Sequence, residues 1–159
     1  MQVQHDSSKL LAIDLGIRSG FALYGDDGRL IRYRSTNFGS RSRLKKAAWG
    51  VLRDIDGLER VVAEGDTGLG EIWQKQAEKF DASFELISAE DWREGLMYDR
   101  YRRSGSDAKE RADTLARQVI ESSGADRPTS LRHDAAEAIL IGLWAVLDIG
   151  WLSENPLED

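Results

Sequence analysis

Short apolar runs alternate with amphipathic stretches along most of the chain, a pattern typical of an α/β domain. Apolar runs of strand length predict five strands, over residues 10–14, 20–24, 29–35, 60–64 and 83–88. Apolar positions at three- and four-residue spacing predict helices over residues 40–58, 71–80, 88–96, 108–120 and 134–151. The first three strands follow one another through short turns, whereas the last two alternate with helices. We therefore expect a mixed five-stranded sheet, an antiparallel meander followed by parallel strands, flanked by helices. The glycine-rich stretch 65–70 and the segment 98–107 lack a core pattern and are predicted to be loops.

Length and composition exclude several classes of protein. A chain of 159 residues predicts one domain spanning 1–159. Cysteine is absent, which excludes disulfides, thiolate metal sites and a cysteine nucleophile, and the two histidines, His5 and His133, are too few for a three-histidine zinc site. Residues 1–9 are polar and the longest apolar stretch, 138–147, is too short to cross a bilayer, so we expect a cytoplasmic protein of a bacterium or of a phage-infected host.

The net charge of −6 is spread unevenly along the chain. Residues 29–46 carry seven basic side chains and no acidic one, residues 100–111 carry five basic and two acidic ones, and residues 134–159 carry six acidic ones and no basic one. Two basic segments with tyrosines and a phenylalanine beside them could follow a phosphate backbone, although they could equally be ordinary solvated faces.

Four carboxylates are the strongest candidates for chemistry. Asp14 and Glu64 end two apolar strands, each close to a glycine, and functional sites of α/β sheets collect at strand ends. Asp134 and Glu137 are three residues apart at the start of the last helix and therefore share one face. Burying four carboxylates together would cost several kcal/mol per ion without compensation, and oxygen-only ligands select Mg²⁺ or Mn²⁺.

Each acid also has a structural explanation. Asp134 and Glu137 would interact favourably with the helix dipole in a first turn, and Asp14 could cap a turn. Glu64 is the hardest to explain by packing, because an acid at the end of an apolar strand seldom serves the core.

The chain resembles the RuvC-type Holliday-junction resolvases of the RNase H-like superfamily. Four ordered blocks that span nearly the whole length carry the resemblance: 11–22 (LAIDLGIRSGFA), 61–64 (VVAE), 105–109 (GSDAK) and 134–141 (DAAEAILI). It implies an RNase H-like fold and a homodimeric, metal-dependent endonuclease that nicks opposing strands of a four-way DNA junction.

The resemblance also implies roles for individual residues. Asp14 corresponds to the acid that bridges two metal ions, Mg²⁺ or Mn²⁺, with Glu64 on one side and Asp134 and Glu137 on the other. Lys109 falls where the family has a basic residue that contacts the scissile phosphate. The residues expected to bind the branched DNA are the basic ones of the two segments: Arg41, Arg43, Lys45, Lys46, Arg100, Arg102, Arg103, Lys109 and Arg111.

The chain departs from the family pattern at several positions. Leu15 stands where proline is common, and Glu137 stands where aspartate is more usual, which could reposition the second metal ion. His133 is a reserve metal ligand, since a histidine replaces an acid in some relatives, but a capping or surface role is favoured for a lone histidine next to a helix start. The stretch after Glu64 lacks the aromatic wedge of relatives, for which Leu69 or Trp73 could substitute, although the spacing of Trp73 favours the core.

Three alternatives remain. The first is another nuclease of the same fold, acting on flaps, branches or RNA–DNA hybrids, because the metal site does not distinguish these substrates. The second is half of an actin-like ATPase, in which residues 134–137 would have no role. The third is a non-catalytic protein of this fold that binds nucleic acid through its basic face.

Overall fold

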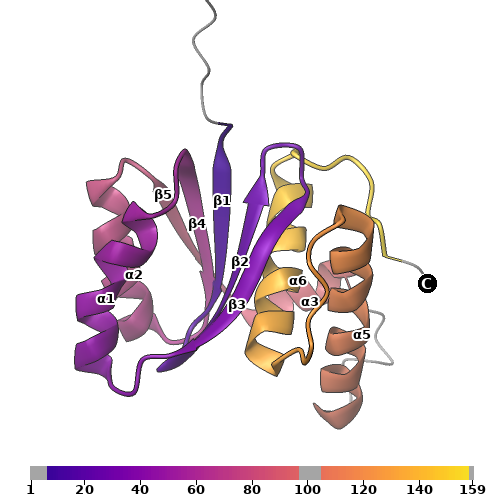
Figure 1. Ribbon diagram of the computed structural model, residues 1–159, viewed down its shortest axis with the longest axis horizontal. Coiled ribbons are helices and arrows are strands. Elements are labelled where there is room, and N and C mark those ends of the chain that lie inside the picture. The colour runs from indigo at the N-terminus through magenta and orange to yellow at the C-terminus, as the bar shows by residue number, and fades with distance from the viewer. Residues whose placement is uncertain (1–6, 97–104, 158–159) are drawn as a thin grey trace, which may run out of the picture.

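A central five-stranded sheet with helices on both faces organises the molecule in the computed structural model, which describes residues 7–96 and 105–157 (Figure 1). The strands are β1 (Lys9–Asp14), β2 (Arg18–Gly25), β3 (Leu30–Asn37), β4 (Leu58–Glu64) and β5 (Ser83–Ile87). The helices are α1 (Arg41–Arg53), α2 (Thr67–Lys79), α3 (Ala89–Leu96), α5 (Gly105–Ser123) and α6 (His133–Asp148). The strand order is β3-β2-β1-β4-β5, with β1, β2 and β3 antiparallel and β1, β4 and β5 parallel. The predicted mixed sheet is confirmed.

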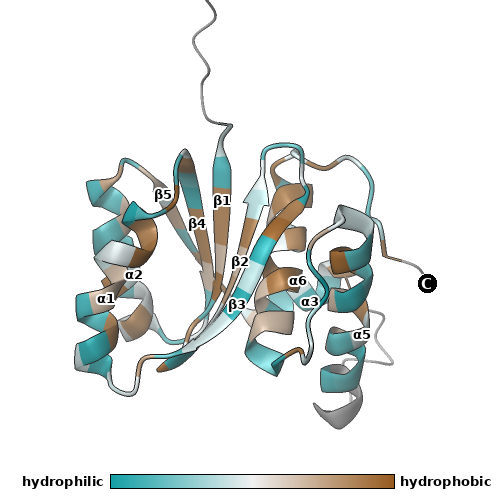
Figure 2. Ribbon diagram, viewed as in Figure 1, coloured by the Kyte–Doolittle hydropathy of each residue, from teal (hydrophilic) through white to brown (hydrophobic). Residues whose placement is uncertain are grey.

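Alternating side chains of the strands divide the core into two layers. Leu11 and Ile13 of β1 pack with α1 and α2 on one face, whereas Leu10 and Ala12 pack with α6 on the other. Figure 2 shows that α6 is strongly hydrophobic and lies between the sheet and α5. Helix α6 is buried on several sides for this reason, and its place is fixed by the buried Tyr24, whose hydroxyl donates a hydrogen bond to the Ile139 carbonyl.

Several predicted boundaries are wrong, among them the end of the helix expected over 134–151, which stops at Asp148. The helix expected over 40–58 ends at Arg53, and a turn with Gly57 at φ 77° leads into β4. Ile55 packs against the α1 and α2 core from outside the helix, which is why the apolar spacing seemed to continue. Most of the glycine-rich stretch 65–70 is the first turn of α2, because the Asp66 side chain accepts a hydrogen bond from the Leu69 amide at 2.9 Å and caps the helix.

Part of the loop predicted over 98–107 is helical, since α5 begins at Gly105. Residues 98–104 lie outside the described residues. None of the helices described is long and apolar enough to cross a membrane.

The carboxyl ends of the parallel strands and the N-termini of most helices lie at one end of the molecule. The carboxyl ends of the parallel strands β1, β4 and β5 lie along the same edge of the sheet, and α2 and α3 begin just beyond β4 and β5. Helices α1, α5 and α6 also begin at this end, which is the lower end in Figure 1. We call it the lower end. Helix N-termini attract anions, so this end of the fold favours a negatively charged ligand.

Candidate active site

The lower end of the sheet carries one row of four residues on the face that α6 covers. Asp14 is the last residue of β1 and pairs with Gly20 of β2 on one side and with Glu64 of β4 on the other. Gly20 in turn pairs with Ser35 of β3. Residues opposite one another on neighbouring strands point to the same face, so Ser35, Gly20, Asp14 and Glu64 follow one another across the sheet. The register therefore places the two strand-end carboxylates side by side.

The first turn of α6 lies directly over this row. A side chain at Gly20 would overlap the backbone carbonyl of Asp134, so the glycine is what allows the helix to approach β2 so closely. The Ser35 hydroxyl donates a hydrogen bond to Oδ2 of Asp134 at 2.9 Å. The other oxygen of Asp134, Oδ1, accepts a hydrogen bond from the Ala135 amide at 2.8 Å. Asp134 is thereby oriented by a neighbouring strand and by its own helix.

Glu137, one helical turn after Asp134, is the most enclosed carboxylate of the site, with 8% of its surface exposed. Its Oε1 atom has two partners: Nη2 of Arg93 from α3 at 3.1 Å, and Nε2 of His133 at 2.9 Å. His133 is the first residue of α6 and does not cap it, since its ring faces Glu137 one turn further along.

The acids lie close enough together to raise the pKa of Asp14 and of Glu64. Burial raises the pKa of Asp14 to about 8, and the charges of Glu137, Glu64 and Asp134 raise it as well, against the opposing effect of Arg93. Burial and the charge of Glu137 also raise the pKa of Glu64, which the indole N–H of Trp92 and the guanidinium of Arg93 partly counteract. The site is therefore short of positive charge.

This donor set fits a divalent cation. Carboxylate oxygens are the preferred ligands of Mg²⁺ and Mn²⁺, and a cation would relieve the repulsion that raises the pKa of Asp14. Within residues 7–96 and 105–157, no three carboxylate or imidazole groups already converge on one point at metal-binding distance. One oxygen of Glu137 is instead engaged by Arg93 and His133. A bound cation would therefore compete with a resident positive charge.

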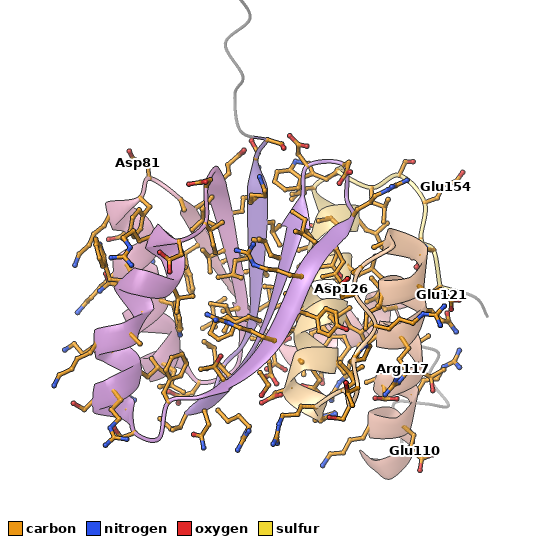
Figure 3. All side chains as sticks on the ribbon, viewed as in Figure 1. Asp81, Glu110, Arg117, Glu121, Asp126 and Glu154 are labelled. Carbon is orange, nitrogen blue, oxygen red and sulfur yellow. The ribbon has the colours of Figure 1, made fainter. Side chains whose placement is uncertain are left out.

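The predicted DNA-binding residues fall at several places. Arg41, at the start of α1, places its guanidinium beside Gly68 in the first turn of α2, at the lower end. Lys109 is exposed near the start of α5; Figure 3 marks the neighbouring Glu110 at the lower end of that helix. Arg43, Lys45 and Lys46 are exposed on α1, and Arg111 is half-buried on α5. The remaining three, Arg100, Arg102 and Arg103, lie outside the described residues.

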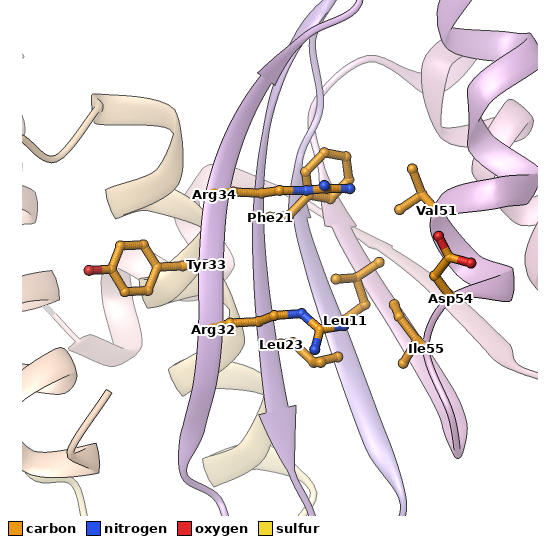
Figure 4. Close-up of a pocket in the computed structure, with 9 residues that line it drawn as sticks. All are labelled: Leu11, Phe21, Leu23, Arg32, Tyr33, Arg34, Val51, Asp54 and Ile55. Carbon is orange, nitrogen blue, oxygen red and sulfur yellow. The ribbon is translucent and has the colours of Figure 1, made fainter. Parts of the chain in front are cut away.

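Two arginines of the basic segment 29–46 line a pocket that is separate from the carboxylates. Arg32 and Arg34 of β3 extend over the sheet face toward Val51 of α1 and Ile55, which follows that helix, around a pocket of about 180 Å³ (Figure 4). The guanidinium of Arg34 lies 5.5 Å from the ring centre of Phe21. This pocket opens on the α1 side of the sheet, opposite to the face that carries the carboxylates.

Neither residue considered as a wedge is available for that role. Leu69 has 8% of its surface exposed, and Trp73 is fully buried in the α1 and α2 core. Trp73 is a core residue, as its helical spacing indicated. The exposed residues that follow Glu64 are Gly65, Asp66 and Thr67.

Sequence reasoning missed three residues that contact the carboxylates. Ser35 could have been found from the register of three adjacent strands, which places it two strands from Asp14. Arg93 and Trp92 gave no signal, because they lie on a short polar helix and meet their partners only in the folded chain.

Comparison with solved structures supports the fold independently. No protein-family model matches the chain, and neither does any curated protein sequence. T. thermophilus RuvC, solved in complex with a Holliday junction substrate, has a similar structure, with a TM-score of 0.60. The alignment covers 90% of this chain and 96% of that chain at 17% sequence identity. The chain therefore has the RNase H-like fold that RuvC has.

Proposed function

We propose that this chain is a metal-dependent endonuclease that resolves four-way DNA junctions by paired, symmetric hydrolysis of phosphodiester bonds. The observation that carries the proposal is the gathering of Asp14, Glu64, Asp134 and Glu137 at the lower end of an RNase H-like sheet. Clustering buried carboxylates destabilises a fold unless cations compensate the charge, so the cluster points to function. The structural similarity to a RuvC solved with its junction supports the class of substrate.

The four carboxylates are the residues that would hold the metal ions. Asp14 lies between Glu64 on the adjacent strand and the acids of α6, so it is the group best placed to be shared. His133 remains a reserve ligand next to Glu137. Two Mg²⁺ or Mn²⁺ ions bound here would lower the pKa of the attacking water and stabilise the leaving 3′-oxygen.

Other groups of the lower end would act on the substrate directly. The first turns of α1, α2, α5 and α6 would present positive helix ends to a phosphate backbone. Arg41 and Lys109 add full charges at the same end. Lys109 would stabilise the negative charge that develops on the scissile phosphate, and the basic side chains of α1 would hold the flanking DNA.

Paired cleavage requires two active sites. One chain carries a single set of the four carboxylates, and one set hydrolyses one strand at a time. Symmetric nicks on opposing strands therefore imply that two copies of the chain act together, which is the reason for including a homodimer in the proposal.

The test uses a synthetic four-way junction, a flap, an RNA–DNA hybrid and a linear duplex, each with Mg²⁺ or Mn²⁺. We expect symmetric paired nicks on the junction alone. Asp14→Asn should abolish cleavage but retain junction binding, because binding depends on the basic residues. Glu78→Gln, on the exposed side of α2, is the matched control and should cleave normally. Preferred cleavage of the flap or the hybrid would overturn the choice of substrate, and cleavage by Asp14→Asn would overturn the site.

A further inference from the structure

We propose that Arg93 is a resident counter-ion of the carboxylate site, which stabilises the metal-free protein and thereby weakens its affinity for the divalent cation. The inference rests on the proposed function, in so far as the site must bind a cation. It concerns a residue outside the four carboxylates, on a helix that contributes no metal ligand.

Helix α3 holds Arg93 in a defined place. Ser88 and Asp91 form reciprocal hydrogen bonds at the helix start, with the Asp91 carboxylate accepting from the Ser88 amide at 2.9 Å and the Ser88 hydroxyl accepting from the Asp91 amide at 3.3 Å. The adjacent Trp92 is fully buried in the core against which α6 packs. The guanidinium of Arg93 lies 5.1 Å from the centre of the Trp92 ring. These contacts therefore hold the Arg93 side chain in a defined position.

The guanidinium contacts the acids, and 35% of the Arg93 side chain is exposed to solvent. Its Nη2 atom lies 3.1 Å from Oε1 of Glu137, and its charge lowers the pKa of both Asp14 and Glu64. Its Nε atom is buried without a hydrogen-bond partner. An arginine near the surface would normally extend into solvent, where water satisfies this N–H group. The attraction of several carboxylates offsets that loss. Arg93 therefore interacts with Asp14 and Glu64 as well as with Glu137.

The effect on metal binding follows from charge. In the metal-free protein Arg93 lies beside three acids, Glu137, Asp14 and Glu64, whereas bound divalent cations would place positive charge there and repel the guanidinium. Arginine stays protonated at any accessible pH, so it cannot escape the repulsion by losing a proton. Arg93 thus stabilises the metal-free form more than the metal-bound form. By linkage, a group with that preference lowers the affinity for the metal.

Direct titration with Mn²⁺, followed by calorimetry or by the paramagnetic resonance signal of free Mn²⁺, tests the inference without any measurement of cleavage. We expect Arg93→Met, which keeps the length of the side chain and removes its charge, to bind Mn²⁺ on the order of 10-fold more tightly than the wild type. With a chelator present, the same variant should unfold at a lower temperature than the wild type, and saturating Mn²⁺ should raise its melting temperature by more than that of the wild type.

Two further variants separate charge from packing. Arg117→Met removes an arginine that pairs with Asp113 at 2.9 Å on the exposed side of α5, and it should leave Mn²⁺ affinity unchanged. Arg93→Lys keeps the charge and should stay within about threefold of the wild type. It also decides the question if Arg93→Met does not fold, because a change of affinity beyond about threefold in the lysine variant would overturn the role of charge.

The outcomes distinguish this inference from the proposed function. If the wild type binds no Mn²⁺, the metal-dependent function fails, and the inference fails with it. If the wild type binds Mn²⁺ and a folded Arg93→Met variant binds it equally well or more weakly, the inference alone is overturned and the nuclease proposal stands.

Discussion

Gly20 of β2 lies directly beneath the backbone carbonyl of Asp134, so closely that a single added methyl group would overlap it. This contact joins the middle of the sheet to the first turn of α6. It places two of the four acids, Asp134 and Glu137, over the strand end that carries Asp14. The close approach of these two backbones therefore determines whether the carboxylates meet at all.

The first prediction concerns this contact. Gly20→Ala should displace the start of α6, destabilise the protein by about 1–3 kcal/mol, as overpacked cores do, and weaken Mn²⁺ binding. Urea unfolding and Mn²⁺ titration measure the two effects. Gly50→Ala in α1 is the matched control, because no other part of the structure lies within 4 Å of the added methyl group. It should be neutral or stabilising, since alanine favours a helix over glycine. Normal metal binding by Gly20→Ala would show that the contact does not position the acids.

The second prediction concerns pH. The pKa of Asp14 is about 8 in the folded protein and near 3.8 when the chain is unfolded, so between these values the folded form holds the additional proton. Stability should therefore fall as the pH rises through this range, because the folded state must release a proton that the unfolded state has already lost. Glu64 acts in the same direction. Asp14→Asn cannot ionise, so its unfolding free energy without metal should decline less steeply.

Chemical denaturation in the presence of a chelator, between about pH 5 and about pH 9, measures this difference. Glu71→Gln, at an exposed position of α2, should follow the wild-type profile. Parallel profiles for the wild type and Asp14→Asn would contradict a raised pKa of Asp14 in the folded protein. Added Mn²⁺ should flatten the wild-type profile, because a bound cation favours the ionised carboxylates.

The third prediction concerns the hydrogen bond from Ser35 to Asp134. Ser35→Ala removes a donor that orients a predicted metal ligand, and loss of such a partner typically weakens metal affinity about 10- to 100-fold. Titration with Mn²⁺ measures the change. Ser83→Ala is the control, because the Ser83 hydroxyl donates a long hydrogen bond of 3.5 Å to the Glu59 carbonyl, at the amino-terminal start of β5. Equal affinities in the two variants would argue against an orienting role for Ser35.

The fourth prediction concerns DNA binding at the lower end. Arg41→Ala should weaken junction binding and reduce the slope of log affinity against log salt concentration by about 1, the change expected for one lost phosphate contact. Lys79→Ala changes a basic residue at the opposite end of α2 and should alter neither quantity. Fluorescence anisotropy at several salt concentrations distinguishes the two. A shared loss of slope would indicate that the DNA does not prefer the lower end.

Particular residues show how far the sequence predicts this structure. The apolar runs that end in Asp14 and Glu64 predicted two adjacent strand ends, because a short apolar run and a terminal acid are local properties of the sequence. Asp134 and Glu137 were predicted on one helical face for the same reason. Their approach to the strands was not predictable from local pattern, because it depends on Gly20, which lies more than a hundred residues away in the chain.

The errors have equally specific causes. Ile55 extended a helical pattern beyond the point where the helix ends, since a residue can pack into the core from a turn. Asp66 was overlooked as a helix cap among the glycines that surround it. Arg93 was missed because an ion pair across 44 residues leaves no trace in local spacing.

The row formed by Ser35, Gly20, Asp14 and Glu64 also links metal binding to the correct pairing of the strands. Successive side chains of a strand point to opposite faces, so a slip of β1 by one residue would turn Asp14 away from α6 and bury it among the side chains of α1 and α2. A misregistered molecule would then lack the proposed metal site as well as its native core. The fraction of a refolded preparation that takes up Mn²⁺ would accordingly count the molecules whose strands have paired in the correct alignment.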